Sequence, residues 1–151
     1  MLAKDIMSSP VATILEDKTV YDAASLMLEQ VVSCLVVVDD SGQIAGILTH
    51  TDFGLHHKFM PLGGDLYQLL GSWADSTTME ETAQRVRGRK IKEVMNREVV
   101  VISEDAPISE VIEVMLQRQV NRLPVLSDGK LVGVITRHDL LKLIISNPDR
   151  S

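Results

Sequence analysis

The sequence is poor in cysteine and in aromatic residues. Cys34 is its only cysteine, and aromatic residues make up 3% of the 151 residues. A single cysteine excludes a disulfide bond within the chain and is typical of a reducing compartment. Because aromatic rings are so few, a hydrophobic core must be built from Val, Ile, Leu and Met, which are abundant within a hydrophobic share of 45%.

The sequence also lacks an excess of basic residues and a long apolar run. Its formal net charge is −6, whereas nucleic-acid-binding proteins normally carry a basic face. The apolar runs are far shorter than the ~20 residues that a membrane-spanning helix needs. The first ten residues, MLAKDIMSSP, contain no apolar signal-peptide core. We therefore expect a cytoplasmic protein that binds neither nucleic acid nor membranes.

An internal duplication accounts for most of the chain. The two copies are offset by 88 residues before Asp40 and by 87 after it, so one residue is extra near Ser41. Matching pairs are Lys4 and Lys92, Met7 and Met95, Ile14 and Ile102, Leu35 and Leu123, Gly46 and Gly133, and Thr49 and Thr136. Each copy alone is too short to bury its apolar faces, so the two should pack together. The predicted divisions are a first repeat at 1–57, an insert at 58–88, a second repeat at 89–146 and a tail at 147–151.

Hydrophobic spacing predicts the same elements in each copy. Apolar residues at helical spacing predict one helix per copy, with these faces: Val20, Ala23, Ala24, Met27, Leu28 and Val31 in the first, and Ile108, Val111, Ile112, Met115 and Leu116 in the second. Thr19 and Asp22 have the spacing of a capping box. Short runs rich in Val, Ile and Leu predict strands at 34–39, 43–49, 122–127 and 130–136. Helices are also predicted at 77–90 and 137–146, the latter with Leu140, Leu141, Ile144 and Ile145 on one face.

The second predicted strand of each copy ends in a repeated motif. It reads GILTHTD at 46–52 and GVITRHD at 133–139. Near a helix start, a Thr hydroxyl can donate to a phosphate oxygen, and an Asp one turn later can accept both hydroxyls of a ribose diol. The alternative is that Thr and Asp only cap the helix, which is the commoner role of a single T-x-x-D. Duplication of the motif weakens that alternative but does not remove it, because a cap would be duplicated too.

The order of these features resembles a known family. The stretch EVMNREVVVISEDAPISEVIEVMLQRQVNRLPVLSDGKLVGVITRHDLL, and its weaker copy in the first repeat, are similar to cystathionine β-synthase (CBS) domains. The resemblance covers residues 4–52 and 91–146. It implies an α/β (α+β) fold in which two β-α-β-β-α repeats, a Bateman module, pack about a pseudo-two-fold axis. It also implies a homodimer.

The resemblance further implies two ligand clefts between the repeats that bind adenosine-type ligands: AMP, ADP, ATP or S-adenosylmethionine. One cleft would use Thr13, Val32, Ser33, Arg122, Thr136, Arg137 and Asp139. The second, weaker cleft would use Thr49, Asp52, Val101, Val120 and Asn121. Arg122 is placed to reach a phosphate, although a solvated Arg at a strand edge is an equal alternative. The first repeat has Cys34 in place of Arg122, which is why its cleft is predicted to be weaker.

No group of residues in the sequence indicates catalysis. His56 and His57 are adjacent, so they do not share a helix face, and no other ligand stands at metal-binding spacing. Arg85, Arg87, Arg89, Lys90 and Lys92 form a basic run that is typical of a solvated helix face. We therefore expect no enzyme activity and no required cofactor. The expected function is that of a regulatory module that binds an adenine nucleotide, for example to sense the cellular energy state, and signals to an unknown effector protein. The alternative is a ligand-independent scaffold for dimerisation.

Overall fold

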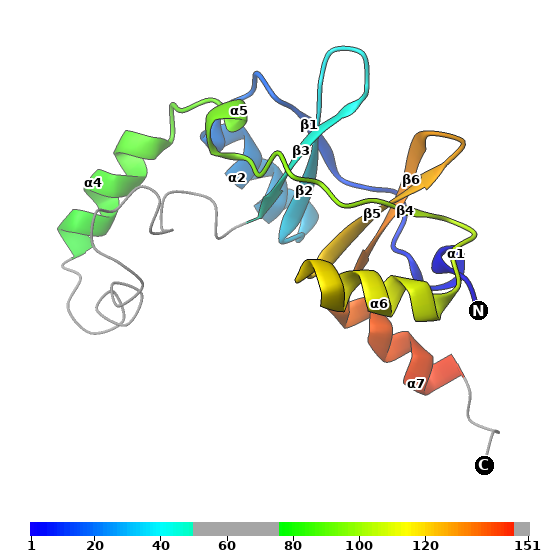
Figure 1. The fold of residues 1–151 in the computed structure, drawn as a ribbon. Helices are drawn as coiled ribbons and strands as arrows, with labels where there is room; N and C mark the ends of the chain where they lie inside the picture. The colour runs from blue at the N-terminus through cyan, green and yellow to red at the C-terminus, as the bar shows by residue number, and fades with distance from the viewer. Residues whose placement is uncertain (50–75, 147–151) are drawn as a thin grey trace. The chain divides into compact units, whose positions relative to one another are not determined.

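The chain folds into two compact units in the computed structural model (Figure 1), which describes residues 1–49 and 76–146. Unit 1 comprises Met1–Val11 and Glu98–Ser151, and unit 2 comprises Ala12–Arg97. Each unit is built from helices and one three-stranded sheet. The mixed α and β fold class predicted from the sequence is therefore confirmed.

The sheet of unit 2 has the order β1-β2-β3. Its strands are β1 (Thr13–Leu15), β2 (Cys34–Val38) and β3 (Ile44–Thr49), and its helices are α2 (Val20–Gln30), α4 (Ser76–Val86) and α5 (Ile91–Val94). β1 is parallel to β2, whereas β2 is antiparallel to β3. The turn between β2 and β3 is held by Asp39, whose Oδ1 accepts hydrogen bonds from the backbone N–H groups of Ser41 at 2.9 Å and Gln43 at 3.0 Å. Gly42 in that turn has φ = 84°, a conformation that favours glycine.

Unit 1 repeats this arrangement. Its strands are β4 (Ile102–Ser103), β5 (Arg122–Ser127) and β6 (Lys130–Thr136), and its helices are α1 (Ala3–Ile6), α6 (Ile108–Arg118), the 3₁₀ helix η2 (Arg137–Leu141) and α7 (Lys142–Ser146). β4 is parallel to β5, and β5 is antiparallel to β6. The four strands predicted from the sequence are confirmed, and the predicted closing helix at 137–146 begins as a 3₁₀ turn.

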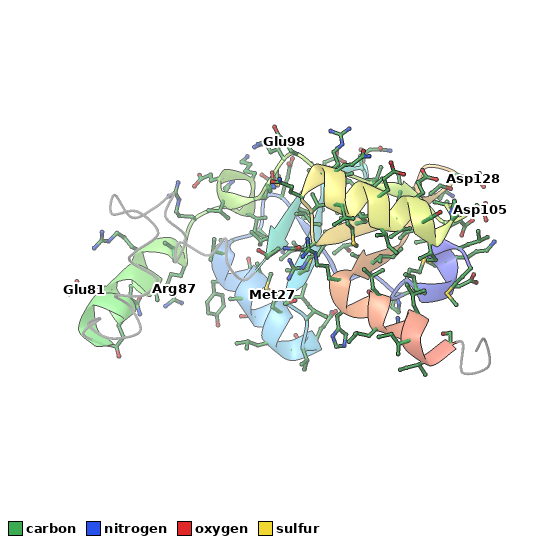
Figure 2. All side chains as sticks on the ribbon, turned by 60° about the horizontal axis from the view of Figure 1, so that its bottom comes forward. Met27, Glu81, Arg87, Glu98, Asp105 and Asp128 are labelled. Atoms are coloured by element: carbon green, nitrogen blue, oxygen red, sulfur yellow. The ribbon has the colours of Figure 1, made fainter. Side chains whose placement is uncertain are left out.

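Aliphatic side chains and methionines form a separate core in each unit. In unit 2, Met27 of α2 packs with Leu35 and Val37 of β2, and Figure 2 labels Met27 on that helix. In unit 1, Met115 of α6 packs with Leu123 and Val125 of β5. Among residues 1–49 and 76–146, the buried members of both cores are aliphatic residues and methionines.

The predicted helix faces were too wide. Leu28 of α2 is 82% exposed and Leu116 of α6 is 67% exposed, although both were assigned to the buried faces. On α7, Ile144 and Ile145 are exposed, while the preceding Leu140 and Leu143 pack against the core of unit 1. The sheet is only three strands wide, so it covers a narrow stripe of each helix. These exposed apolar side chains form surfaces that the intra-unit packing does not use.

The segment before the first strand of each repeat belongs to the unit that holds the other repeat. Lys4 of α1 forms an ion pair with Asp105 at 2.8 Å, and Figure 2 labels Asp105 near the start of α6, beside α1. In unit 2, Lys92 of α5 forms the equivalent ion pair with Asp17 at 3.0 Å. The compact units therefore differ from the sequence divisions at 1–57 and 89–146, because the segments 1–11 and 91–97 are exchanged between them.

Candidate functional site

Arg122 and Thr136 lie opposite one another in the sheet of unit 1. Arg122 begins β5 and Thr136 ends β6, and the antiparallel register pairs the two residues directly. In unit 2 the same register pairs Cys34 with Thr49. The side chain at position 122 or 34 is therefore the neighbour of the motif threonine in each unit. Arg122 is half-buried, and the Nε atom of its guanidinium is shielded from solvent.

Thr136 and Asp139 form a reciprocal cap at the start of η2. The Oδ2 of Asp139 accepts hydrogen bonds from the backbone N–H of Thr136 at 2.8 Å and from its hydroxyl at 3.2 Å. Thr19 and Asp22 form the same cap on α2, as the sequence predicted. The capping role that the sequence left open for T-x-x-D is therefore real at Asp139. It does not decide whether Asp139 has a second role.

Asp139 differs from an ordinary cap in its other oxygen. Its Oδ1 accepts a hydrogen bond from the Ser8 hydroxyl at 3.1 Å and an ion-paired hydrogen bond from Lys142 Nζ at 2.9 Å. Asp139 is only 5% exposed, and among the described residues it is the one buried polar or charged side chain. Neither Ser8 nor Lys142 was predicted as a site residue. Lys142 could have been found from its position three residues after Asp139 on a helix, whereas no local signal in the sequence points to Ser8.

Opposing effects set the pKa of Asp139. Burial alone would raise the pKa, because it disfavours the charged carboxylate. The hydrogen bonds from Lys142, from the backbone of Thr136 and from Ser8 outweigh burial and lower the pKa below its ordinary value of 3.8. Asp139 is therefore a carboxylate at neutral pH, and it can act only as a hydrogen-bond acceptor.

Two more of the predicted site residues of unit 1 are joined beside this cap. The backbone N–H of the exposed Arg137 donates to the carbonyl oxygen of Asn121 at 3.1 Å, so the end of β6 is tied to the residue before Arg122. Val120 packs partly against the core, and Val101 is 41% exposed. The structure thus brings Arg122, Thr136, Arg137 and Asp139 together with Asn121.

The remaining predicted residues belong to unit 2. Thr13 is exposed on β1 opposite Val36, Val32 packs partly against the core, and Ser33 is exposed just before β2. Thr49 is half-buried at the end of β3. Asp52 of the second motif lies outside the described residues, as do His56 and His57. The residues predicted for each cleft therefore come from both units.

The glycine of each motif allows the exchanged segment to approach the sheet. A Cβ placed on Gly46 would lie 2.6 Å from the Sδ of Met95 and 2.8 Å from the carbonyl oxygen of Asn96. At Gly133 the equivalent Cβ would overlap the Sδ of Met7. In each motif the glycine is thus a packing requirement. Gly133 thereby allows Met7 and Ser8 to lie alongside β6 in unit 1.

The basic run is largely neutralised by neighbouring groups. Arg89 pairs with Glu93 at 3.2 Å, and Lys90 and Lys92 both face Asp17. Arg87, labelled in Figure 2, lies over the ring of Tyr21 at 5.0 Å from the ring centre. These contacts agree with a solvated helix face rather than with a site for phosphate. Within residues 1–49 and 76–146, no cluster of three metal-ligating side chains occurs. In the same residues no helix is long and apolar enough to cross a bilayer.

Comparison with known proteins identifies relatives over almost the whole chain. The family model described as CBS domain matches residues 3–53 and 91–146. An uncharacterised protein of Methanocaldococcus jannaschii, MJ1426, is 30% identical over 96% of this chain and 92% of its own length. The CBS domain of a CBS-domain-containing membrane protein from Sphaerobacter thermophilus is 32% identical, with a TM-score of 0.74 over 95% of this chain and 87% of that chain. The CBS domain pair of protein MJ0100, solved in complex with 5-methylthioadenosine and S-adenosyl-L-methionine, is 26% identical, with a TM-score of 0.68 over 95% of this chain and 99% of that chain.

Proposed function

Since the chain belongs to the CBS domain family and carries two copies of the domain, we propose that it is a regulatory module that binds adenosine-type ligands. The observation that carries the proposal is the direct pairing of Arg122 with Thr136, three residues before the buried carboxylate of Asp139. This places a cation, a hydroxyl and a carboxylate together at one strand end. The similarity to a domain pair solved with two adenosine-type ligands supports the same ligand class.

The proposed stronger site combines these residues with three from unit 2. Arg122 and Thr136 would contact a phosphate or another anionic group, with Arg137 beside them, and Asp139 would accept the ribose hydroxyls. Thr13, Val32 and Ser33 would flank the adenine base. The weaker site would use Thr49, Asp52, Val101, Val120 and Asn121. It has Cys34 where the stronger site has Arg122, so it offers no fixed cation at that position.

The ligands in question are AMP, ADP, ATP and S-adenosylmethionine. Binding of a nucleotide would favour one arrangement of the two repeats over others, and an effector protein would respond to that arrangement. In this proposal the protein has no catalytic activity of its own, acts as a homodimer and senses the adenine nucleotide pool. The single cysteine, Cys34, favours the cytoplasm as its place of action.

A second candidate function is a ligand-independent assembly scaffold. The exposed apolar side chains of Leu28, Leu116, Ile144 and Ile145 favour it, because they are available for contact with another chain. A scaffold, however, needs neither Arg122 nor the buried Asp139 at the end of β6. The two functions therefore differ in whether a small molecule changes the stability of the protein.

Isothermal titration and thermal denaturation with AMP, ADP, ATP and S-adenosylmethionine test the proposal. A ligand that binds only the folded protein adds roughly 2.7 kcal/mol of stability at a concentration of 100 times Kd. We expect at least one of the four to bind and to raise Tm. Arg122→Cys, which introduces the residue that the first repeat has at the equivalent position, Cys34, should weaken that binding. The absence of heat and of a Tm shift for all four at millimolar concentration would leave the scaffold as the better account.

A further inference from the structure

The carboxylate of Asp139 has no acceptor site left for a ribose. An ionised carboxylate offers about four lone-pair positions. Thr136 fills two at Oδ2 with its backbone N–H and its hydroxyl. Ser8 and Lys142 fill two at Oδ1, at 3.1 Å and 2.9 Å. A vicinal diol that uses Asp139 must therefore displace existing donors.

The donors at Oδ1 are the ones that can leave. The N–H of Thr136 belongs to the helix cap, and losing it would expose a backbone donor at the start of η2. Ser8 and Lys142 instead donate through a hydroxyl and an ammonium group that can turn toward solvent, since Ser8 is exposed and the side chain of Lys142 is 45% exposed. The Oδ1 side of the carboxylate is thus the side that a ligand can take.

Both of these donors involve the N-terminal segment: Ser8 is part of it, and Lys142 donates a hydrogen bond to it. Ser8 exchanges backbone hydrogen bonds with Val134 of β6, at 2.9 Å and 3.0 Å. Lys142 Nζ also donates to the carbonyl oxygen of Ile6 at 2.8 Å. Asp139 therefore lies at the point where residues 6–8 are fastened to β6 and α7. The same segment continues through Val11 into unit 2.

We propose that Ser8 and Lys142 are positioning residues that compete with the ribose diol for Asp139, so that ligand binding loosens residues 1–8 from unit 1. This inference rests on the proposed binding of adenosine-type ligands. It adds a direct link between the ligand and the segment that joins the two units. Because the coupling is reciprocal, a change that stabilises the contact of residues 1–8 with unit 1 must weaken ligand binding by the same factor.

The two motifs differ in sequence at the two donor positions. The residue equivalent to Ser8 is Asn96, and its backbone pairs with Ile47 as that of Ser8 does with Val134. In the sequence, the position equivalent to Lys142 is Leu55, which carries no donor. Removal of a donor at the second motif and removal of its counterpart at the first therefore form a matched pair of variants.

Titration of Ser8→Ala and of the control Asn96→Ala with adenosine, AMP, ATP and S-adenosylmethionine tests the competition. Without the Ser8 hydroxyl, Oδ1 is open to the diol, so we expect Kd to fall about three- to tenfold, which corresponds to the net contribution of one ordinary hydrogen bond. Lys142→Met should also lower Kd, because it removes the other donor at Oδ1. Asn96→Ala should leave Kd unchanged. 2′,3′-Dideoxyadenosine lacks the diol, so Ser8→Ala should not improve its binding.

Hydrogen exchange provides a second measurement on the unaltered protein. Saturating ligand should speed exchange of the N–H groups of Met7 and Ser8, which are bonded to Ala3 and Val134 in the structure. An unchanged or higher Kd in Ser8→Ala, or an equal gain with the dideoxy compound, would overturn the competition and leave the proposed function intact. Failure of all the ligands to bind the unaltered protein would remove both.

Discussion

Lys4 and Asp105 form an ion pair at 2.8 Å although 101 residues separate them in the chain. The contact is accompanied by backbone hydrogen bonds from Ala3 to Ala106 at 2.8 Å and from Lys4 to Glu104 at 3.0 Å. Lys92 and Asp17 form the counterpart in unit 2. Each repeat thus contributes its first helix to the unit that holds the other repeat. Separation of the two repeats at residue 58 or 89 would therefore divide both cores.

The N-terminal segment should contribute to stability through burial rather than through its charge. Ile6 is fully buried in the core of unit 1, whereas Lys4 and Asp105 are exposed to solvent. We expect Ile6→Ala to lower the free energy of unfolding by about 2–5 kcal/mol. Lys4→Ala should change it little, because exposed ion pairs are screened by water and salt. Urea denaturation of both variants checks this, and a larger loss in Lys4→Ala than in Ile6→Ala would contradict it.

Stability should fall in acid through Asp139. Its pKa is lower in the folded protein than its ordinary value of 3.8, because Lys142, Thr136 and Ser8 together outweigh the effect of burial. A lowered folded-state pKa adds stability above the unfolded pKa, and that contribution is lost as the pH falls through the folded pKa. We expect the Tm of Asp139→Asn to depend less on pH below 3.8 than that of the unaltered protein. Parallel Tm curves for the two proteins between neutral and strongly acid pH would count against this role.

Exposed apolar side chains should mediate self-association. Ile144 and Ile145 of α7 are 75% and 77% exposed, and Leu28 and Leu116 add to the exposed apolar surface of the two units. We expect light scattering at micromolar concentration to give twice the chain mass of 16.7 kDa. Ile144→Lys combined with Ile145→Lys should shift the protein toward the monomer. Ser146→Lys places a charge on the same helix as a control, and it should not. A monomer for the unaltered protein would refute this prediction.

The sequence predicted those parts of the fold that depend on local patterns. Strands β2, β3, β5 and β6 and the cap formed by Thr19 and Asp22 follow from residue type and spacing, and they were predicted. The short helices α1 and α5 were not, because four residues are too few to show a helical period. The exposure of Leu28 was missed because helical spacing gives the direction of a side chain but not the width of the sheet beneath it.

The same limit applies to the site. Thr136 and Asp139 were predicted as site residues because their motif occurs in both copies, and Arg122 was predicted through the family resemblance. The pairing of position 122 with Thr136 then follows from the register of two adjacent strands. Ser8 was missed because its contact with Asp139 spans 131 residues and depends on the exchange of the N-terminal segment between units. No pattern along the chain records such an exchange.

The two sites should differ in affinity. Arg122 lies opposite Thr136, whereas Cys34 lies opposite Thr49, and a guanidinium bound to a phosphate contributes about 1.5–3 kcal/mol. This corresponds to roughly one to two decades in Kd. Asp139→Ala should therefore abolish the tighter site, and Asp52→Ala should leave it nearly unchanged.

Exchanging the residues opposite the two threonines gives a reciprocal test of that asymmetry. Arg122→Cys should weaken the tighter site tenfold or more toward a phosphate-bearing ligand such as AMP or ATP, and by less toward adenosine, which has no phosphate. Cys34→Arg should strengthen the weaker site, because it supplies the missing cation beside Thr49. Isothermal titration of the four variants gives the affinities, and thermal denaturation without ligand checks that each variant is folded. This check matters most for Asp139→Ala, because Asp139 also caps η2. Equal losses from Asp139→Ala and Asp52→Ala in folded protein would show that Arg122 does not distinguish the two sites.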